Sequence, residues 1–228
     1  MAAFAEDSRV HELEIREPEV AWMVTFGVEA PVADFGLNGL FPDWRSGFYD
    51  GARVSVPVAV ELVRAMLRDN GAWCRLEVED RFLVHVGYDQ YVYLGSVDPC
   101  ERAQARAVDL GLFVEPIKQS PYAADDADYA NTVVADDEFW NRVKAAVPVG
   151  GSLMLAEAHV ANDWRRHRIT SQNLAQVRSE LGPRAEVRIW EPSPDDDDIE
   201  TPWPLLFIGV LPDADGVLRR RRARLLDE

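Results

Sequence analysis

The stretch of residues 73–117 constrains the fold most, because its hydrophobic period changes from that of a strand to that of a helix and back. It begins with three short runs that are rich in β-branched and aromatic residues. Short polar breaks at Glu79-Asp80 and Tyr88-Asp89 separate these runs, which is the spacing of β-hairpins. The sequence therefore predicts a three-stranded meander over Trp73–Val78, Arg81–Val86 and Gln90–Leu94.

A helix signal follows this meander directly. Asp98 is a suitable N-cap, and Pro99 suits the first helical position. The helical pattern ends at Gly111, and an apolar run over residues 112–117 then predicts another strand. A meander followed by a helix and a further strand indicates the α+β class.

The rest of the chain continues this alternation of helix and strand patterns. We expect an α+β protein with an antiparallel or mixed sheet and about four helices packed on it. The pattern allows two similar lobes, residues 1–118 and 119–228, or one continuous domain. The further helices are expected over residues 57–68, 136–147 and 171–181, and the further strands over residues 20–28, 152–160, 185–190, 205–211 and 217–226.

The first nineteen residues are strongly charged. Glu12, Glu14 and Arg16 alternate with Leu13 and Ile15. An alternation of charged and apolar residues with a period of two is typical of a strand with one face buried. We expect an arm or an edge strand here.

The charge of the chain is strongly negative. Forty acidic residues face 24 basic ones, which gives a formal net charge of −16 at pH 7. Such a charge opposes binding to phosphate backbones and to anionic membranes, and it attracts basic proteins. The partner that we expect is therefore a basic protein, and direct binding to nucleic acid is disfavoured. A role in solubility alone is the alternative.

We expect a cytoplasmic protein that does not cross a membrane. No apolar run reaches the length of a transmembrane helix, and the acidic N-terminal residues do not resemble a signal peptide. Cys74 and Cys100 are the only cysteines, and they are expected to be free thiols. We expect no metal site and no cofactor, because the chain contains no glycine-rich nucleotide-binding motif, no nucleophile elbow and no paired Cys-x-x-Cys.

One constellation has residue types that are suited to catalysis. Glu157 and His159 would lie on the same face of a strand, and His167 would return from the following loop. Two imidazoles and a carboxylate can act as acid and base or bind iron or zinc. The spacing matches no established motif, so a histidine on a sheet face without a catalytic role is the alternative.

Arginines gather at two places in the second half. Arg165 and Arg166 stand beside His167, and Arg220 and Arg222 belong to the predicted last strand. Guanidinium groups bind phosphates and carboxylates, so together they would form an anion site. As alternatives, a charged edge strand prevents aggregation, or these arginines pair with the aspartates of residues 195–198.

The segment Asp195, Asp196, Asp197 and Asp198 is expected to be an exposed loop, because adjacent carboxylates repel one another. Trp203 lies close to it in the sequence. An aromatic anchor with an acidic rim is typical of a protein-binding surface. We therefore expect a protein-binding module that engages or neutralises a basic partner, as immunity and inhibitor proteins do. The alternative is a hydrolase or transferase that holds a small anionic substrate with the arginines and uses Glu157, His159 and His167.

Overall fold

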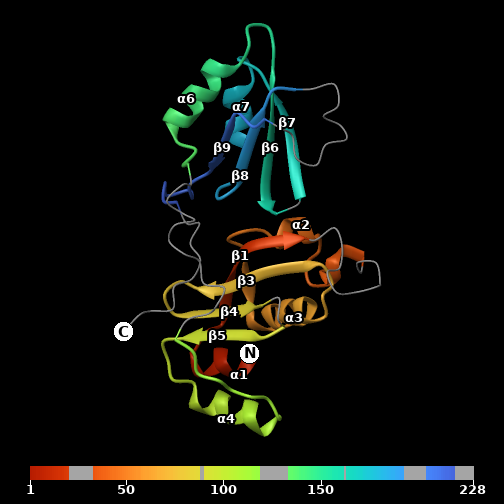
Figure 1. Ribbon diagram of the computed structural model, residues 1–228, viewed down its shortest axis with the longest axis vertical. Helices are drawn as coiled ribbons and strands as arrows, with labels where there is room; N and C mark the ends of the chain where they lie inside the picture. Colours follow the sequence, from red (N-terminus) through yellow and green to blue (C-terminus); the bar gives the residue numbers. More distant parts are fainter. Residues whose placement is uncertain (21–32, 88–89, 119–132, 162, 193–203, 219–228) are drawn as a thin grey trace. The chain divides into compact units, whose positions relative to one another are not determined.

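The structure is a computed structural model that describes residues 1–20, 33–87, 90–118, 133–161, 163–192 and 204–218 (Figure 1). The described residues form two compact units, the first from residues 1–118 with 160 and 161, the second from residues 133–159 and 163–218. The first unit holds a five-stranded antiparallel sheet and the second a four-stranded one. The predicted α+β class is therefore confirmed. The division into domains stays a prediction.

The sheet of the first unit has the strand order β2-β1-β3-β4-β5. The predicted meander is present as β3, β4 and β5. The prediction of an arm or an edge strand at the N-terminus is wrong, because β1 pairs with β2 on one side and β3 on the other. The elements of this unit are α1 (Ala2–Asp7), β1 (Glu12–Val20), η1 (Ala33–Gly36), α2 (Trp44–Gly47), β2 (Arg53–Ser55), α3 (Val56–Leu67), β3 (Ala72–Val78), β4 (Phe82–Val86), β5 (Val92–Ser96) and α4 (Glu101–Asp109).

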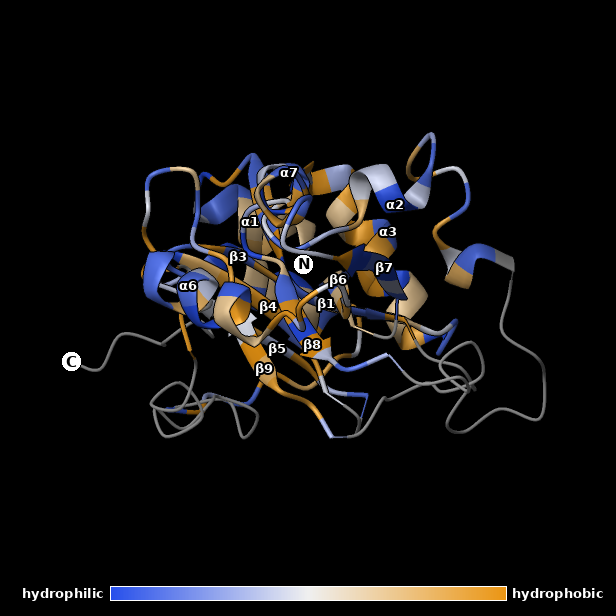
Figure 2. Ribbon diagram, turned by 90° about the horizontal axis from the view of Figure 1, so that it is seen from above, coloured by the Kyte–Doolittle hydropathy of each residue, from blue (hydrophilic) through white to orange (hydrophobic). Residues whose placement is uncertain are grey.

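One face of this sheet forms the core of the first unit together with α1 and α3. Strand alternation sends every second side chain of β1, β3 and β4 to this face, where apolar residues gather. In Figure 2, which is coloured by hydropathy, the apolar residues of the strands and of α3 appear in orange. Glu14 and Arg16 of β1 and Arg75 and Glu77 of β3 alternate with these apolar residues, so they lie on the opposite face. The buried core residues include Leu13, Ile15, Leu62, Val63, Cys74, Leu76, Phe82 and Val84.

The sheet of the second unit has the strand order β7-β6-β8-β9. Helices α6 and α7 contribute apolar side chains to the same buried cluster as β6 and β8, so both helices cover one face of the sheet. Asp136 caps α6 by accepting a hydrogen bond from the backbone N–H of Phe139 at 2.9 Å. The elements are α6 (Asp137–Ala146), β6 (Leu153–Val160), β7 (Asp163–Ile169), α7 (Leu174–Glu180), β8 (Glu186–Trp190) and β9 (Phe207–Val210).

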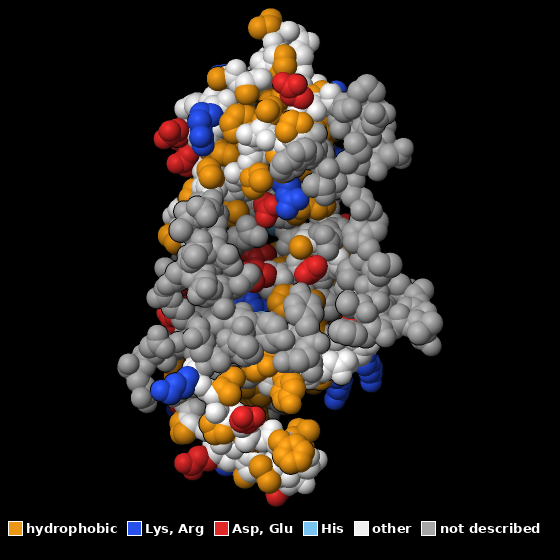
Figure 3. Space-filling model, viewed as in Figure 1, with side chains coloured by type: hydrophobic (Ala, Val, Ile, Leu, Met, Phe, Trp, Pro, Cys, Tyr) orange, Lys and Arg blue, Asp and Glu red, His pale blue; other side chains and the backbone are white. Residues whose placement is uncertain are grey.

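The segment after α4 differs from the prediction. Asp98 does not cap the helix, because Cys100 occupies the N-cap position with a positive φ of 49°. Residues 112–117 form no strand, so that prediction is wrong. Their side chains are exposed, and Phe113 is 101% exposed. Figure 3 shows hydrophobic side chains at the end of the first unit that holds α4.

Two predicted strands fall wholly or largely on residues that the structure does not describe, namely residues 20–28 and 217–226. Among the helices that the structure describes, none has the length and the apolar composition needed to cross a membrane.

Candidate functional site

The structure assembles one of the predicted constellations in the second unit. Glu157 lies on β6 within the buried face, where it follows Leu153 and Leu155 in the strand alternation. His159 lies two residues further along the same strand, so it faces the same side. His167 and Arg165 reach Glu157 from the neighbouring strand β7, and not from a loop as predicted.

Five nitrogen atoms surround the carboxylate of Glu157. The Nε2 atom of His159 lies 3.3 Å from Oε1, and that of His167 lies 3.3 Å from Oε2. Arg165 donates from Nε to Oε2 at 2.8 Å and also from Nη2. The backbone N–H of Gly182 donates to Oε1 at 2.9 Å. The carboxylate therefore holds β6, β7 and the turn after α7 together.

Gly182 allows this close approach. A Cβ atom at residue 182 would lie 2.5 Å from Cε1 and Nε2 of the His159 ring, which is closer than real Cβ contacts. Only glycine lets the backbone N–H reach Glu157 while the imidazole ring stays beside the carboxylate.

Glu157 is fully ionised at neutral pH. Burial acts to raise its pKa, but the hydrogen bonds from His159, from the Gly182 backbone and from Arg165, with the charge of Arg165, outweigh burial and lower the pKa to about 2. Only 1% of the side chain is exposed. A carboxylate with this pKa is a poor proton acceptor at neutral pH, and it orients its neighbours instead.

The other candidate residues for an anion site do not converge in the same way. Arg166 follows Arg165 on β7, so strand alternation directs it to the opposite face of the sheet. The other predicted binding residues, Asp195–Asp198, Trp203, Arg220 and Arg222, lie outside the described residues. Within the described ranges, no group of three or more His, Cys, Asp or Glu side chains is arranged to hold a metal ion. The catalytic role of Glu157, His159 and His167 stays a prediction.

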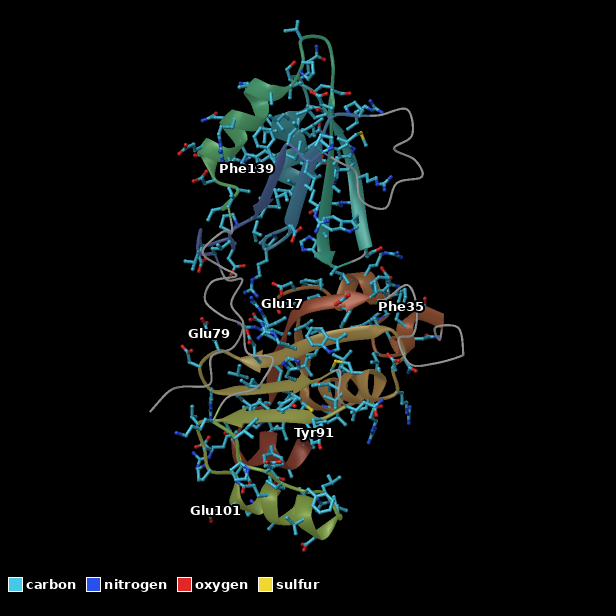
Figure 4. All side chains as sticks on the ribbon, in the orientation of Figure 1. Glu17, Phe35, Glu79, Tyr91, Glu101 and Phe139 are labelled. Carbon is cyan, nitrogen blue, oxygen red and sulfur yellow. The ribbon has the colours of Figure 1, made fainter. Side chains whose placement is uncertain are left out.

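A second cluster lies on the first unit, on the sheet face opposite α3. We call it the acidic face, and it consists of the carboxylates Glu14, Glu17, Asp50 and Glu77 with the guanidinium groups of Arg16 and Arg75. Figure 4 labels Glu17 beside β1. In the antiparallel pairing of β1 and β3, Glu14 lies opposite Glu77 and Arg16 lies opposite Arg75. Like charges directly opposite one another destabilise a strand pair.

Arg16 offsets this repulsion by bridging three carboxylates. Its Nη1 atom lies 3.7 Å from Oε2 of Glu14, and its Nε atom lies 3.6 Å from Oδ1 of Asp50 and 3.4 Å from Oε1 of Glu77. The side chain is only 3% exposed, so these attractions are weakly screened by water.

A β-bulge positions the fourth carboxylate. The register of β1 against β3 shifts between Arg16 and Glu19, where Pro18 has no N–H to donate. Glu17 takes a positive φ of 47° there, and its backbone N–H donates to Oδ1 of Asp50 at 2.8 Å. The bulge brings Glu17 to Arg75, whose Nε donates to Oε2 at 3.2 Å.

Glu77 titrates near neutral pH. Burial raises its pKa to about 7; Arg75 and Arg16 act to lower the pKa, while Glu14 and Asp50 act to raise it. Its side chain is 8% exposed. Oε2 is buried and has no hydrogen-bond partner among the described residues. A proton on Glu77 removes a buried charge that the two arginines compensate only in part.

The sequence indicates the charged residues of only one of the two strands that form the acidic face. The alternation of Glu12, Glu14 and Arg16 with apolar residues marks one charged face of a strand. The residues Arg75-x-Glu77 lie in a run whose pattern predicts a meander strand and no charged cluster. What the sequence could not provide is the pairing of β1 with β3, which brings the two charged rows together.

The comparisons with known proteins add no further information on these sites. The chain matches no protein-family model, and the searches of curated proteins and of solved structures found no match.

Proposed function

We propose that this protein is a protein-binding module that engages a basic partner through the acidic face of its first unit, in the manner of immunity and inhibitor proteins. One observation carries the proposal. Four carboxylates gather around two guanidinium groups on the acidic face. When all six groups are charged, this face has a surplus of two negative charges.

The accessible part of the acidic face suits a positively charged partner. The side chains of Glu14 and Glu17 are 22% and 23% exposed and form its rim, while Arg16 and Arg75 are buried. Arg53 of β2 is exposed and lies directly opposite Glu14, so a basic group that approaches this rim meets two carboxylates and one guanidinium group. Such an arrangement increases the rate of association with basic proteins and orients them.

The Glu157 cluster gives less support to catalysis. The pKa of about 2 keeps Glu157 ionised, and both of its oxygens already receive hydrogen bonds. Its position between two strands and a turn favours a role in stability. Elsewhere on the side shown in Figure 3, acidic and basic side chains are interspersed, which is typical of a solvated surface.

Fluorescence anisotropy of a labelled hexa-arginine peptide tests the proposal. A Glu14→Gln, Glu17→Gln double variant should bind this peptide about 5- to 30-fold more weakly than the wild type, because each exposed ion pair contributes roughly 0.5–1 kcal/mol. The matched control is a Glu138→Gln, Glu180→Gln double variant, which loses two exposed acids from the second unit and the same net charge. Its affinity should change less than twofold.

A third variant, in which Asp195–Asp198 are replaced by Ser, tests the acidic loop that the sequence favoured. If this variant loses the binding and the Glu14→Gln, Glu17→Gln variant keeps it, the acidic face is not the binding surface. Equal losses in the two double variants would show that only net charge matters, and they would also overturn the proposal.

A further inference from the structure

Strand β5 is the last strand at one edge of the sheet in the first unit, beside β4 (Figure 1). The backbone N–H of Gly87 donates to the carbonyl oxygen of Tyr91, and that of Val97 donates to the carbonyl oxygen of Arg81. In an antiparallel ladder, residues bonded to the neighbouring strand alternate with residues whose N–H and C=O groups point away from it. Every second residue of β5 therefore directs these groups to the outer side of the sheet. These residues are Val92, Leu94 and Ser96.

The outward groups of β5 are available to a further strand. In the part of the chain that the structure describes, the backbone N–H and C=O groups of Val92, Leu94 and Ser96 have no hydrogen-bond partner. The neighbouring side chain of Tyr91 is 67% exposed (Figure 4), so another molecule can reach this edge. A row of unpaired backbone groups on an edge strand is a template for pairing with another chain.

The other edge strands of the described sheets are protected against such pairing. Strand β2 is three residues long and presents the exposed Arg53. Strand β7 carries basic side chains over residues 165–168, and Val210 of β9 exchanges hydrogen bonds with the backbone of residues 133 and 135. Short strands, charges and covering segments are the devices that prevent unwanted pairing. Strand β5 lacks this protection, because residues 90–97 include no charged residue and no proline.

We infer that β5 pairs with β5 of a second copy of this chain, in an antiparallel register centred on Leu94. In this register Val92 lies opposite Ser96 of the second copy, so the outward N–H and C=O groups of the two strands face one another. Both copies use the same surface, so the contact is closed after two chains. The inference goes beyond the proposed function, and its test does not depend on the acidic face.

The side chains complement one another in this register. Tyr93 of one copy lies opposite Gly95 of the other, where an aromatic ring covers the backbone that glycine leaves bare. Tyr91 lies opposite Val97, and pairs of an aromatic and a β-branched residue stabilise neighbouring strands. The side chain of Val97 is 52% exposed in the single chain, so pairing removes apolar surface from water. No pair places like charges opposite each other, and a strand without charge offers a basic partner no ion pair.

Analytical ultracentrifugation of the full chain tests the inference. We expect a monomer–dimer equilibrium whose dissociation constant falls as NaCl is raised from about 0.1 M to 1 M, because salt screens the repulsion between two chains of net charge −16. Hydrogen exchange should show that the amides of Val92, Leu94 and Ser96 become protected as the protein concentration rises. A chain that stays monomeric at about 1 mM, where even a weak dimer is populated, would overturn the inference. A dimer that leaves these amides unprotected would overturn it as well.

Two double variants at exposed positions test the register. Tyr91→Lys with Val97→Lys places like charges opposite each other at both symmetry-related contacts, whereas Tyr91→Lys with Val97→Glu places opposite charges there. Within one chain the two positions are about 20 Å apart along the strand, so the charges interact mainly between copies. The first variant should dimerise about 10- to 30-fold more weakly than the second, although its net charge is less negative. Equal dissociation constants would show that the copies meet elsewhere and would overturn the inference.

Discussion

Replacing Glu157 by Gln tests how the second unit is held together. The variant keeps the shape of the side chain but removes the negative charge that pairs with Arg165. It also places an NH₂ group beside hydrogen-bond donors, because Arg165 Nε and the backbone N–H of Gly182 donate to the two oxygens of Glu157. The pKa of about 2, compared with an ordinary value of 4.5, means that the fold stabilises the ionised form of Glu157 by roughly 3 kcal/mol, at 1.36 kcal/mol per pKa unit. Because Arg165 is 60% exposed and screened by water, we expect a cost of about 2–3 kcal/mol at pH 7.

The pH dependence follows from the direction of this shift. The pKa of Glu157 is lower in the folded than in the unfolded chain, so the carboxylate stabilises the fold above about pH 4.5. This contribution is lost as the pH falls from 4.5 toward 2. The difference between the wild type and Glu157→Gln should therefore close as the pH falls from 4.5 toward 2.

Native-state hydrogen exchange of the amides of β6 and β8 measures this difference in the second unit alone. Glu180→Gln, which removes an exposed carboxylate from α7, is the control and should change stability by less than about 0.5 kcal/mol. A cost below about 1 kcal/mol for Glu157→Gln at pH 7, or an unchanged slope between pH 4.5 and pH 2, would refute the assigned role.

Two further substitutions test local features of the second unit. Gly182→Ala should lower the free energy of unfolding of the second unit by about 1–3 kcal/mol in the same exchange experiment, because the new Cβ atom meets the His159 ring. It should also shift the NMR signals of that ring. Unchanged His159 signals would contradict the close approach. Asp136→Ala should destabilise α6 by about 1 kcal/mol in urea unfolding, because it removes the cap of Phe139 N–H; an unaltered urea midpoint would show that the cap is not formed in solution.

The elements with a strong local signal could be predicted from the sequence. The meander alternates apolar and polar residues, and α6 begins with a side-chain cap, so both were predicted close to their observed positions. Strand β7 was missed because its sequence, DWRRHRI, is polar on both faces, which an edge strand tolerates. Residues 112–117 gave the opposite error, because an apolar run forms a strand only where a neighbouring strand is available.

The two candidate sites also differ in how far the local sequence predicts them. Glu157 and His159 share one strand, so their common face followed from strand alternation alone. Glu14 and Glu77 come from strands distant in the sequence, and their approach depends on a pairing that the sequence does not encode locally. The positive φ of Glu17, which brings this residue to Arg75, also has no local sequence signature apart from the adjacent Pro18.

Strand β1 has apolar residues on one face and charged residues on the other. Leu13 and Ile15 are buried among apolar neighbours, while Glu14 and Arg16 lie on the charged side. Under the proposed function, a substitution at the partly exposed Glu14 changes the binding surface and leaves the apolar packing of Leu13 and Ile15 in place. Partner specificity could then vary at this position of β1 while the fold stays the same.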